Sequence, residues 1–211
     1  MSEKQNETYI DDLKEIRSMM EKSSRFISLS GLSGISAGLV ALVGAVVAWW
    51  YIQNNFGTSM YSMRNITSID LKDLVFLLMD AGIVLVLALA CAAYFAMRKA
   101  RLQNLPVWNK AAELTFVNLM IPLAAGGIFC LFLFYYNLYL LIAPATLIFY
   151  GLALLNASKF TLHEIRYLGI TEIILGLIAM AIPGYSLIFW SLGFGILHIV
   201  YGAVMYFRYE R

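Results

Sequence analysis

Four ionisable side chains interrupt the long apolar stretches of this sequence: Asp80, Glu113, Glu172 and His198. A titratable group inside a membrane is costly, so each one is a candidate functional residue. Glu172 and His198 fall in neighbouring apolar stretches, and the helical rise places them within about 6 Å of each other in depth. A Glu–His pair can exchange a proton near neutral pH. The pair therefore predicts either a proton-responsive site or a fixed polar link between two helices.

The other polar candidates lie nearer the membrane surfaces. Asp80 is about 10 Å from the outer end of its predicted helix, where a carboxyl must face other helices or a water-filled vestibule. Glu113 lies close to the opposite surface, and Asn118 follows five residues deeper. Contact with interfacial water or hydrogen bonding between helices explains Glu113 and Asn118 without a substrate. For Asp80, a functional and a structural interpretation both stay open.

The composition requires that membrane-spanning helices position these side chains. The 211 residues are 61% hydrophobic and only 13% charged, and the mean hydropathy is +0.76. Soluble domains carry about 25% charged residues, and a spanning helix needs about 20 mainly apolar residues. The sequence therefore predicts an all-α membrane protein, with a six-helix transmembrane domain over 27–207, a cytoplasmic segment 1–26 and a cytoplasmic tail 208–211. The six predicted spans are 27–52, 73–97, 112–135, 138–156, 168–183 and 186–207.

The positions of the basic residues predict the orientation of this bundle. If the N-terminus lies in the cytoplasm, thirteen of the fifteen Lys and Arg residues fall on the cytoplasmic side, and only Arg64 and Lys72 fall outside. Such an excess of positive charge is typical of cytoplasmic loops. Both termini are therefore predicted to be cytoplasmic.

Residues 8–25 have the pattern of a short amphipathic helix ahead of the first span. Ile10, Leu13, Ile16 and Met20 recur every three or four residues, with charged residues on the opposite face. A helix of this kind can rest on the surface of the lipid bilayer. The alternatives are the seam of a homo-oligomer and a docking site for a cytosolic protein.

Small residues mark faces where helices can approach one another closely. On the first predicted span the stripe contains a Gly-xxx-Gly pair, which predicts internal packing or homodimerisation. Glu172 shares a glycine-rich face of the fifth span and His198 shares one of the sixth. These two faces are predicted to pack together or against the first span. The glycines concerned are Gly34, Gly38, Gly169, Gly176, Gly195 and Gly202.

The last four spans have the pattern of two helical hairpins. The third and fourth are separated by only Tyr136 and Asn137, and the fifth and sixth by residues 183–185, which include Pro and Gly. Tyr-Gly pairs recur at Tyr150-Gly151 and Tyr201-Gly202 in corresponding places. The sequence therefore favours a bundle built from repeated two-helix hairpins.

The segment 169–202 (GITEIILGLIAMAIPGYSLIFWSLGFGILHIVYG) resembles the hairpin unit of HdeD-like bacterial membrane proteins. Those proteins have a Gly-rich helix, a Pro at its outer end and a second Gly-rich helix. The segment 15–35 is also similar to the juxtamembrane start of inner-membrane proteins of Gram-negative bacteria. The resemblance implies a bacterial inner-membrane location. HdeD-like proteins are linked to acid-stress resistance, but the charged N-terminal extension departs from their pattern, so that role is not carried over.

Motifs for other classes of function are missing from the sequence. It has no Gly-rich phosphate loop, no Cys-x-x-Cys pair and no nucleophile elbow, and its two histidines are too few for a haem or zinc site. The basic segment 98–110 is explained by topology and anionic lipid, not by nucleic acid. We therefore expect no cofactor, no metal and no enzymatic activity. The leading hypothesis is a membrane protein with a regulatory, sensory or accessory role. The alternative is a small transporter or channel with a polar route near Glu172, His198 and Asp80.

The predicted topology is testable by the accessibility of single introduced cysteines. Positions in 57–68 should react with a membrane-impermeant thiol reagent from outside, because they form the long outer loop. Positions in 100–108 and 157–165 should react only from the cytoplasmic side. Labelling of any residue in 100–108 from outside would contradict the six-helix arrangement.

Overall fold

The structure is a computed structural model, and it describes residues 30–56, 70–103, 106, 108–182 and 184–211. All the regular secondary structure in these ranges is helical. The predicted helix in 8–25 lies outside them. The helices are α2 (Gly31–Phe56), α3 (Leu71–Leu102), α4 (Lys110–Tyr135), η2 (Tyr139–Leu141), α5 (Ile142–Ala157), η3 (Ser158–Phe160), α6 (His163–Ala181), α7 (Ser186–Trp190), η4 (Ser191–Leu197) and α8 (His198–Tyr209).

Several of these helices are long and apolar enough to cross a membrane. The five segments that meet this description are Gly31–Asn55, Leu71–Leu102, Lys110–Tyr135, Tyr139–Phe160 and Ser186–Tyr209. They make the chain a multi-pass membrane protein. With α6 added, the described residues form six long helical segments, which fits the predicted helix count.

The helix α6 differs most from its predicted span of 168–183. It begins at His163, five residues earlier. Its first turn is polar and contains Glu164 and Arg166, so a search for apolar spans passes over it. Together with Glu172, these residues give α6 more charged side chains than the apolar segments of the other long helices contain. Hydropathy alone therefore placed the start of α6 too late.

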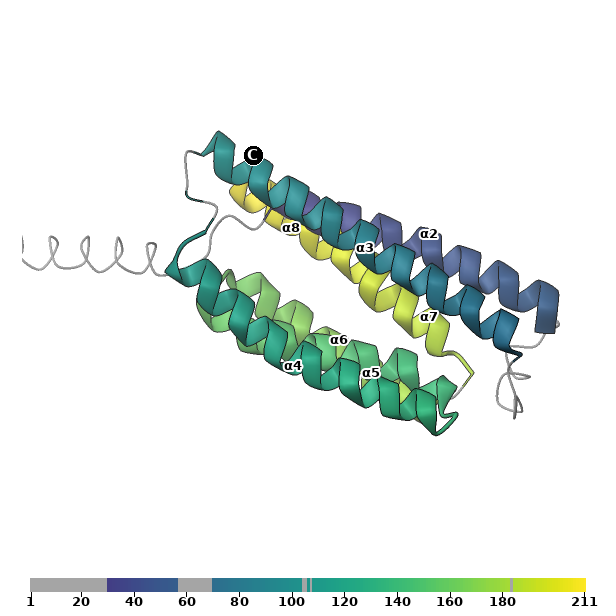
Figure 1. The fold of residues 1–211 in the computed structure, drawn as a ribbon. Helices are drawn as coiled ribbons and strands as arrows, with labels where there is room; N and C mark the ends of the chain where they lie inside the picture. Colours follow the sequence, from purple (N-terminus) through teal and green to yellow (C-terminus); the bar gives the residue numbers. More distant parts are fainter. Residues whose placement is uncertain (1–29, 57–69, 104–105, 107, 183) are drawn as a thin grey trace, which may run out of the picture.

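The helices form two layers (Figure 1). One layer contains α2, α3 and α8, with α2 packed against both of the others, and the second contains α4, α5 and α6, with α5 in the middle. The segments α7, η4 and α8 follow one another without a break, and α6 contacts all three of them across the layers. The last two long helices therefore belong to different layers.

Within the second layer, α5 and α6 approach each other at glycines. A Cβ added at Gly169 would lie 2.7 Å from the carbonyl oxygen of Gly151, and one at Gly176 would lie 2.9 Å from that of Pro144. Real Cβ atoms do not approach backbone so closely. Only glycine therefore permits this crossing.

The same kind of crossing joins α2 to the continuous segment η4–α8 in the first layer. A Cβ at Gly202 would lie 2.7 Å from the carbonyl oxygen of Gly31, and one at Gly38 would lie 2.6 Å from that of Gly195. The small-residue face of the last helix thus packs against the first span, which is one of the two arrangements predicted from the sequence. The face of α6 packs instead against α5.

The two crossings share one spacing. In α2, in α5, in α6 and in the continuous segment η4–α8, the two contact positions are seven residues, or about two turns, apart. The arrangement gives α2 with α8 and α6 with α5 an equivalent pattern of contacts. The hairpin repeat itself stays a prediction. The pairs of positions are Gly31 and Gly38, Gly195 and Gly202, Gly169 and Gly176, and Pro144 and Gly151.

Paired charges hold the helix ends together where the described chain begins and ends. The Glu210 carboxylate accepts hydrogen bonds from the Ser30 hydroxyl, at 3.1 Å, and from the Gly31 N–H. Its Oε1 also lies 3.4 Å from the Lys99 Nζ atom. This contact links α2, α3 and the end of α8. Breaking such a buried pair would leave an uncompensated charge.

A second group of contacts links α6 to α8 at the same end. Glu164 accepts hydrogen bonds from Arg208, at 2.8 Å, and from the Tyr209 hydroxyl, at 3.0 Å. Beside it, a buried apolar cluster joins α5, the start of α6 and α8. The cluster contains Leu154, Leu162, Ile165, Leu168 and Met205. The layers are thus tightly packed at this end.

The glycine crossing predicts a clear difference between two Gly→Ala substitutions. Gly169→Ala should lower the free energy of unfolding by about 1–3 kcal/mol, because backbone atoms of α5 cannot move aside for the new methyl group. Gly127→Ala is the matched control, since nothing lies within 4 Å of the Cβ that it adds. Thermal unfolding in detergent micelles measures both. Equal stability of the two variants would contradict the close crossing.

Candidate functional site

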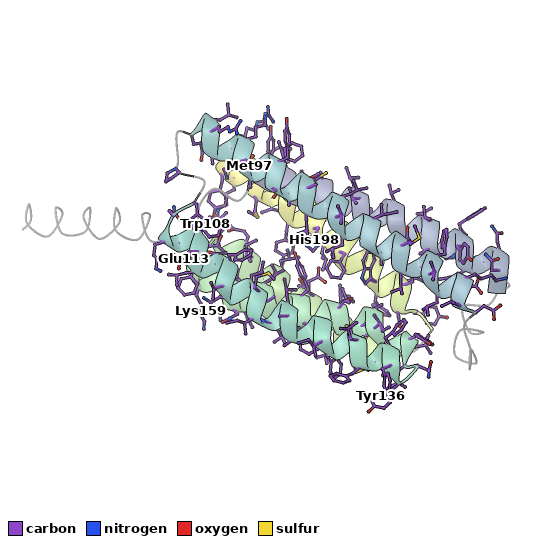
Figure 2. All side chains as sticks on the ribbon, in the orientation of Figure 1. Met97, Trp108, Glu113, Tyr136, Lys159 and His198 are labelled. Carbon is purple, nitrogen blue, oxygen red and sulfur yellow. The ribbon has the colours of Figure 1, made fainter. Side chains whose placement is uncertain are left out.

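The candidate site lies where α6 of one layer meets α8 of the other. Glu172 is on α6 and His198 is the first residue of α8, and the His198 Nδ1 atom lies 3.5 Å from the Glu172 Oε1 atom. Glu172 is 0% exposed and His198 is 7% exposed. Figure 2 shows His198 between the layers. The structure thus brings together the two residues that the sequence paired.

The Glu172 carboxyl has no hydrogen-bond partner among the described residues. Both of its oxygen atoms are buried without one, and the Gln53 Oε1 atom is the only other buried side-chain atom of which this is true in the same ranges. Buried polar groups in proteins are nearly always hydrogen-bonded. An unpartnered carboxyl at this depth is a costly feature that packing alone does not explain.

His198, in contrast, has a partner for each ring nitrogen. Its Nδ1 atom lies 3.0 Å from the Gly193 carbonyl oxygen, and its Nε2 atom lies 2.8 Å from the Tyr150 hydroxyl. A carbonyl oxygen can only accept, so Nδ1 carries the hydrogen and donates it to Gly193. The Tyr150 hydroxyl can then donate to Nε2. The neutral imidazole ring therefore has all of its hydrogen bonds.

The Gly193 carbonyl belongs to a π-helix, η4, which spans Ser191–Leu197. Short π-helical turns within longer helices are often found at functional sites. A Cβ at Gly193 would overlap the Glu172 Oε2 atom and lie 2.5 Å from the Leu147 Cδ2 atom. The missing side chain of Gly193 is what leaves room for the carboxyl.

Aromatic rings cover the histidine side of the site. The centroid of the Phe194 ring lies 4.9 Å from that of Tyr150 and 5.8 Å from that of His198, and the Trp190 ring follows at 5.0 Å from Phe194. These rings pack beside the imidazole and restrict its orientation. The histidine side of the site is therefore lined by aromatic rings.

Asp80 lies away from this pair. It is on α3, which packs against α2 in the other layer, and its side chain is half-buried. Within the described ranges no hydrogen bond or ion pair joins its carboxyl to Glu172 or to His198. The structure does not bring together the three residues of the predicted polar route.

Glu113 and Asn118 have local partners. The Lys110 Nζ atom donates to the Glu113 carboxylate at 3.0 Å in an exposed contact within the first turn of α4. The Asn118 amide donates to the Leu114 carbonyl, and the Asn118 carbonyl accepts from Asn156 on α5. These contacts favour the structural interpretation of both residues.

Two members of the site were not singled out for it by the sequence. Tyr150 was noted only as part of a recurring Tyr-Gly pair, and a tyrosine in an apolar helix is more typical of packing or of the membrane interface. Gly193 precedes Gly195 by two residues, a spacing that does not place them on one helical face. Neither residue carried a local signal for contact with Glu172 or His198.

The donor set at this site suits a proton better than a metal. Across the described ranges, no three His, Cys, Asp or Glu side chains are grouped as metal ligands would be.

Comparisons with protein families, with curated proteins and with solved structures find no match to the chain. The resemblance to HdeD-like proteins therefore stays a prediction.

The contact between Tyr150 and His198 predicts a loss of stability in Tyr150→Phe. The substitution leaves the buried Nε2 atom without its donor, which should cost about 1–2 kcal/mol in the free energy of unfolding. Tyr201→Phe is the matched control, because the second Tyr-Gly pair has no hydroxyl contact among the described residues. Thermal unfolding of both variants in micelles gives the comparison. A Tyr150→Phe variant as stable as Tyr201→Phe would argue against the bond.

Proposed function

We propose that this protein is a non-enzymatic membrane protein with a sensory or regulatory role, and that Glu172 is the group that binds the proton it senses. One observation carries the proposal: a wholly buried carboxyl without a hydrogen-bond partner lies 3.5 Å from a histidine whose own hydrogen bonds are complete. Such a carboxyl can change its charge, and that change has an immediate neighbour to act on.

The cost of buried charge supports Glu172 as the proton acceptor. An ionised carboxylate in an apolar interior costs several kcal/mol unless it is paired, and protonation removes that cost. A second proton on His198 would instead turn Nε2 into a donor and leave the Tyr150 hydroxyl in need of a new acceptor. The proton is therefore better held by Glu172, beside a neutral imidazole ring.

The contrast with Glu164 on the same helix supports a special role for Glu172. Glu164 is also buried, but it accepts hydrogen bonds from Arg208 and Tyr209. Its charge is compensated, as expected for a structural carboxylate. The α6 helix thus contains one paired carboxylate near its start and one unpaired carboxyl in its middle.

We further propose that the protein lies in a bacterial inner membrane with both termini in the cytoplasm. The alternating helix directions support this, because they gather basic residues at one end of the bundle. Figure 2 shows Lys159 near this end with Trp108 and Glu113, whereas Tyr136 lies at the other end. In this proposal the segment 8–25 carries the signal to a cytosolic protein or to a second copy of the chain.

Reaction with dicyclohexylcarbodiimide, which modifies protonated carboxyls in apolar surroundings, tests the proposed function. In reconstituted protein, Glu172 should react while it is protonated. Its rate of modification should fall about tenfold per pH unit once it ionises. Mass spectrometry of the peptide that contains Glu172 measures the rate.

Two variants control this experiment. Glu172→Gln should abolish modification of that peptide, and Glu164→Gln should leave it unchanged, because Glu164 is engaged with Arg208 and Tyr209. A rate at Glu172 that does not vary across the neutral pH range would show that this carboxyl does not titrate there. The proposal of a proton sensor would then fail.

A further inference from the structure

The single N–H of the neutral His198 ring has two acceptors within reach. The Nδ1 atom lies 3.0 Å from the Gly193 carbonyl oxygen and 3.5 Å from the Glu172 Oε1 atom. One hydrogen cannot satisfy both acceptors well. Which of them receives it depends on their relative strength, and that of Glu172 changes with its charge.

We propose that ionisation of Glu172 moves the His198 N–H from the Gly193 carbonyl to the carboxylate, and that the π-helix η4 changes its hydrogen-bond register in response. This inference rests on the proposed function, because it needs Glu172 to exchange a proton. A hydrogen bond to a charged acceptor is roughly twice as strong as one between neutral groups. The ionised carboxylate therefore outcompetes the carbonyl.

The His198 ring N–H is a donor within reach of Glu172, whereas the Tyr150 hydroxyl is already engaged with His198 Nε2. The titratable side chains that pack near it are Tyr150 from α5 and His198 from α8, with Tyr201 one turn further along α8. The segments α7 and η4 contain no titratable residue. The other charges on or beside α6 lie at its start. They are Glu164 and Arg166 on α6, Lys159 on η3 and Arg208 on α8.

The π-helix is the element that must respond to this exchange. In a π-helix a carbonyl faces the N–H five residues later, which for Gly193 is that of His198, so the His198 ring N–H is an additional, side-chain donor to this carbonyl. Loss of the ring N–H leaves the choice of backbone donor to the helix register. If the Gly193 carbonyl pairs with the N–H four residues later, at Leu197, the local structure becomes α-helical. A π-helix and an α-helix differ by one residue in this spacing. The exchange therefore selects between two discrete helix registers.

The helix α2 packs directly against η4, so a change of register in η4 acts on it. The Gly195 carbonyl of η4 lies against Gly38, and a Cβ at Gly195 would overlap the side chain of Leu42. Because this contact is between backbones, a change of register in η4 cannot be absorbed by a flexible side chain. The start of α2 follows directly on the N-terminal segment. The charge state of Glu172 is thereby coupled to α2.

Two isotopic labels test this exchange directly by NMR. Gly193-Phe194 is the only Gly-Phe pair in the sequence, so ¹³C-carbonyl glycine combined with ¹⁵N-phenylalanine gives one signal, from the Gly193 carbonyl. The chain has two histidines, so ¹⁵N-histidine gives two sets of ring signals, and His163→Gln identifies those of His198. Both labels are observed in the full chain in lipid nanodiscs as the pH is raised.

In the wild type, the Gly193 carbonyl signal should shift over the same pH range in which carbodiimide modification of Glu172 declines. The His198 ring should stay neutral, with its hydrogen on Nδ1, on both sides of the transition. Glu172→Gln should hold the carbonyl signal at its low-pH position. Glu164→Gln should leave the transition in place. In hydrogen exchange at matched high pH, residues 31–42 should exchange at different rates in the wild type and in Glu172→Gln.

The outcomes separate this inference from the proposed function. If modification of Glu172 depends on pH but the Gly193 carbonyl signal does not move, the exchange is wrong and the proton site stands. The same holds if the signal moves equally in Glu172→Gln, or if His198 carries its hydrogen on Nε2. If modification does not depend on pH, the proposed function itself fails.

Discussion

The backbone contacts at glycines are the constraint on which the arrangement of this bundle depends. Inside a bilayer the helices gain little by hiding apolar side chains from one another, so they associate where small residues allow close packing. Such contacts join α5 to α6 and α2 to the continuous segment η4–α8 at positions two turns apart. Glu172 lies between Gly169 and Gly176 on the α6 face that takes part in one crossing. The glycines therefore determine where the carboxyl is buried.

Each crossing joins helices within one layer, so the contact between the layers depends on other residues. Side chains between α6 and α8 form that contact (Figure 1). Near the ends of the described chain the link consists of paired charges and an apolar cluster. In the middle it consists of Glu172, His198 and Tyr150. Only this second link contains a buried carboxyl without a partner in the described ranges.

The two buried carboxyls of α6 differ in their hydrogen bonding. Glu164 and Glu172 are both buried carboxyls on α6, and hydropathy treats them alike. Glu164 is held by an arginine and a tyrosine, so its charge contributes to packing. Glu172 lies against the backbone of Gly193 in the π-helix η4, next to His198, and its carboxyl has no hydrogen-bond partner among the described residues.

The sequence by itself determined the helical class, the six apolar segments and the Glu172–His198 pairing, because hydropathy, helical period and depth are local properties of a chain. It also identified the glycines that pack. Only the tertiary structure decided which helix each glycine face meets, because an apolar stripe fits several partners equally well. It alone placed Tyr150 on His198, which lies 48 positions away in the sequence, and formed the π-helix that presents Gly193. Those contacts arise from helices closing on one another, and no spacing within one helix encodes them.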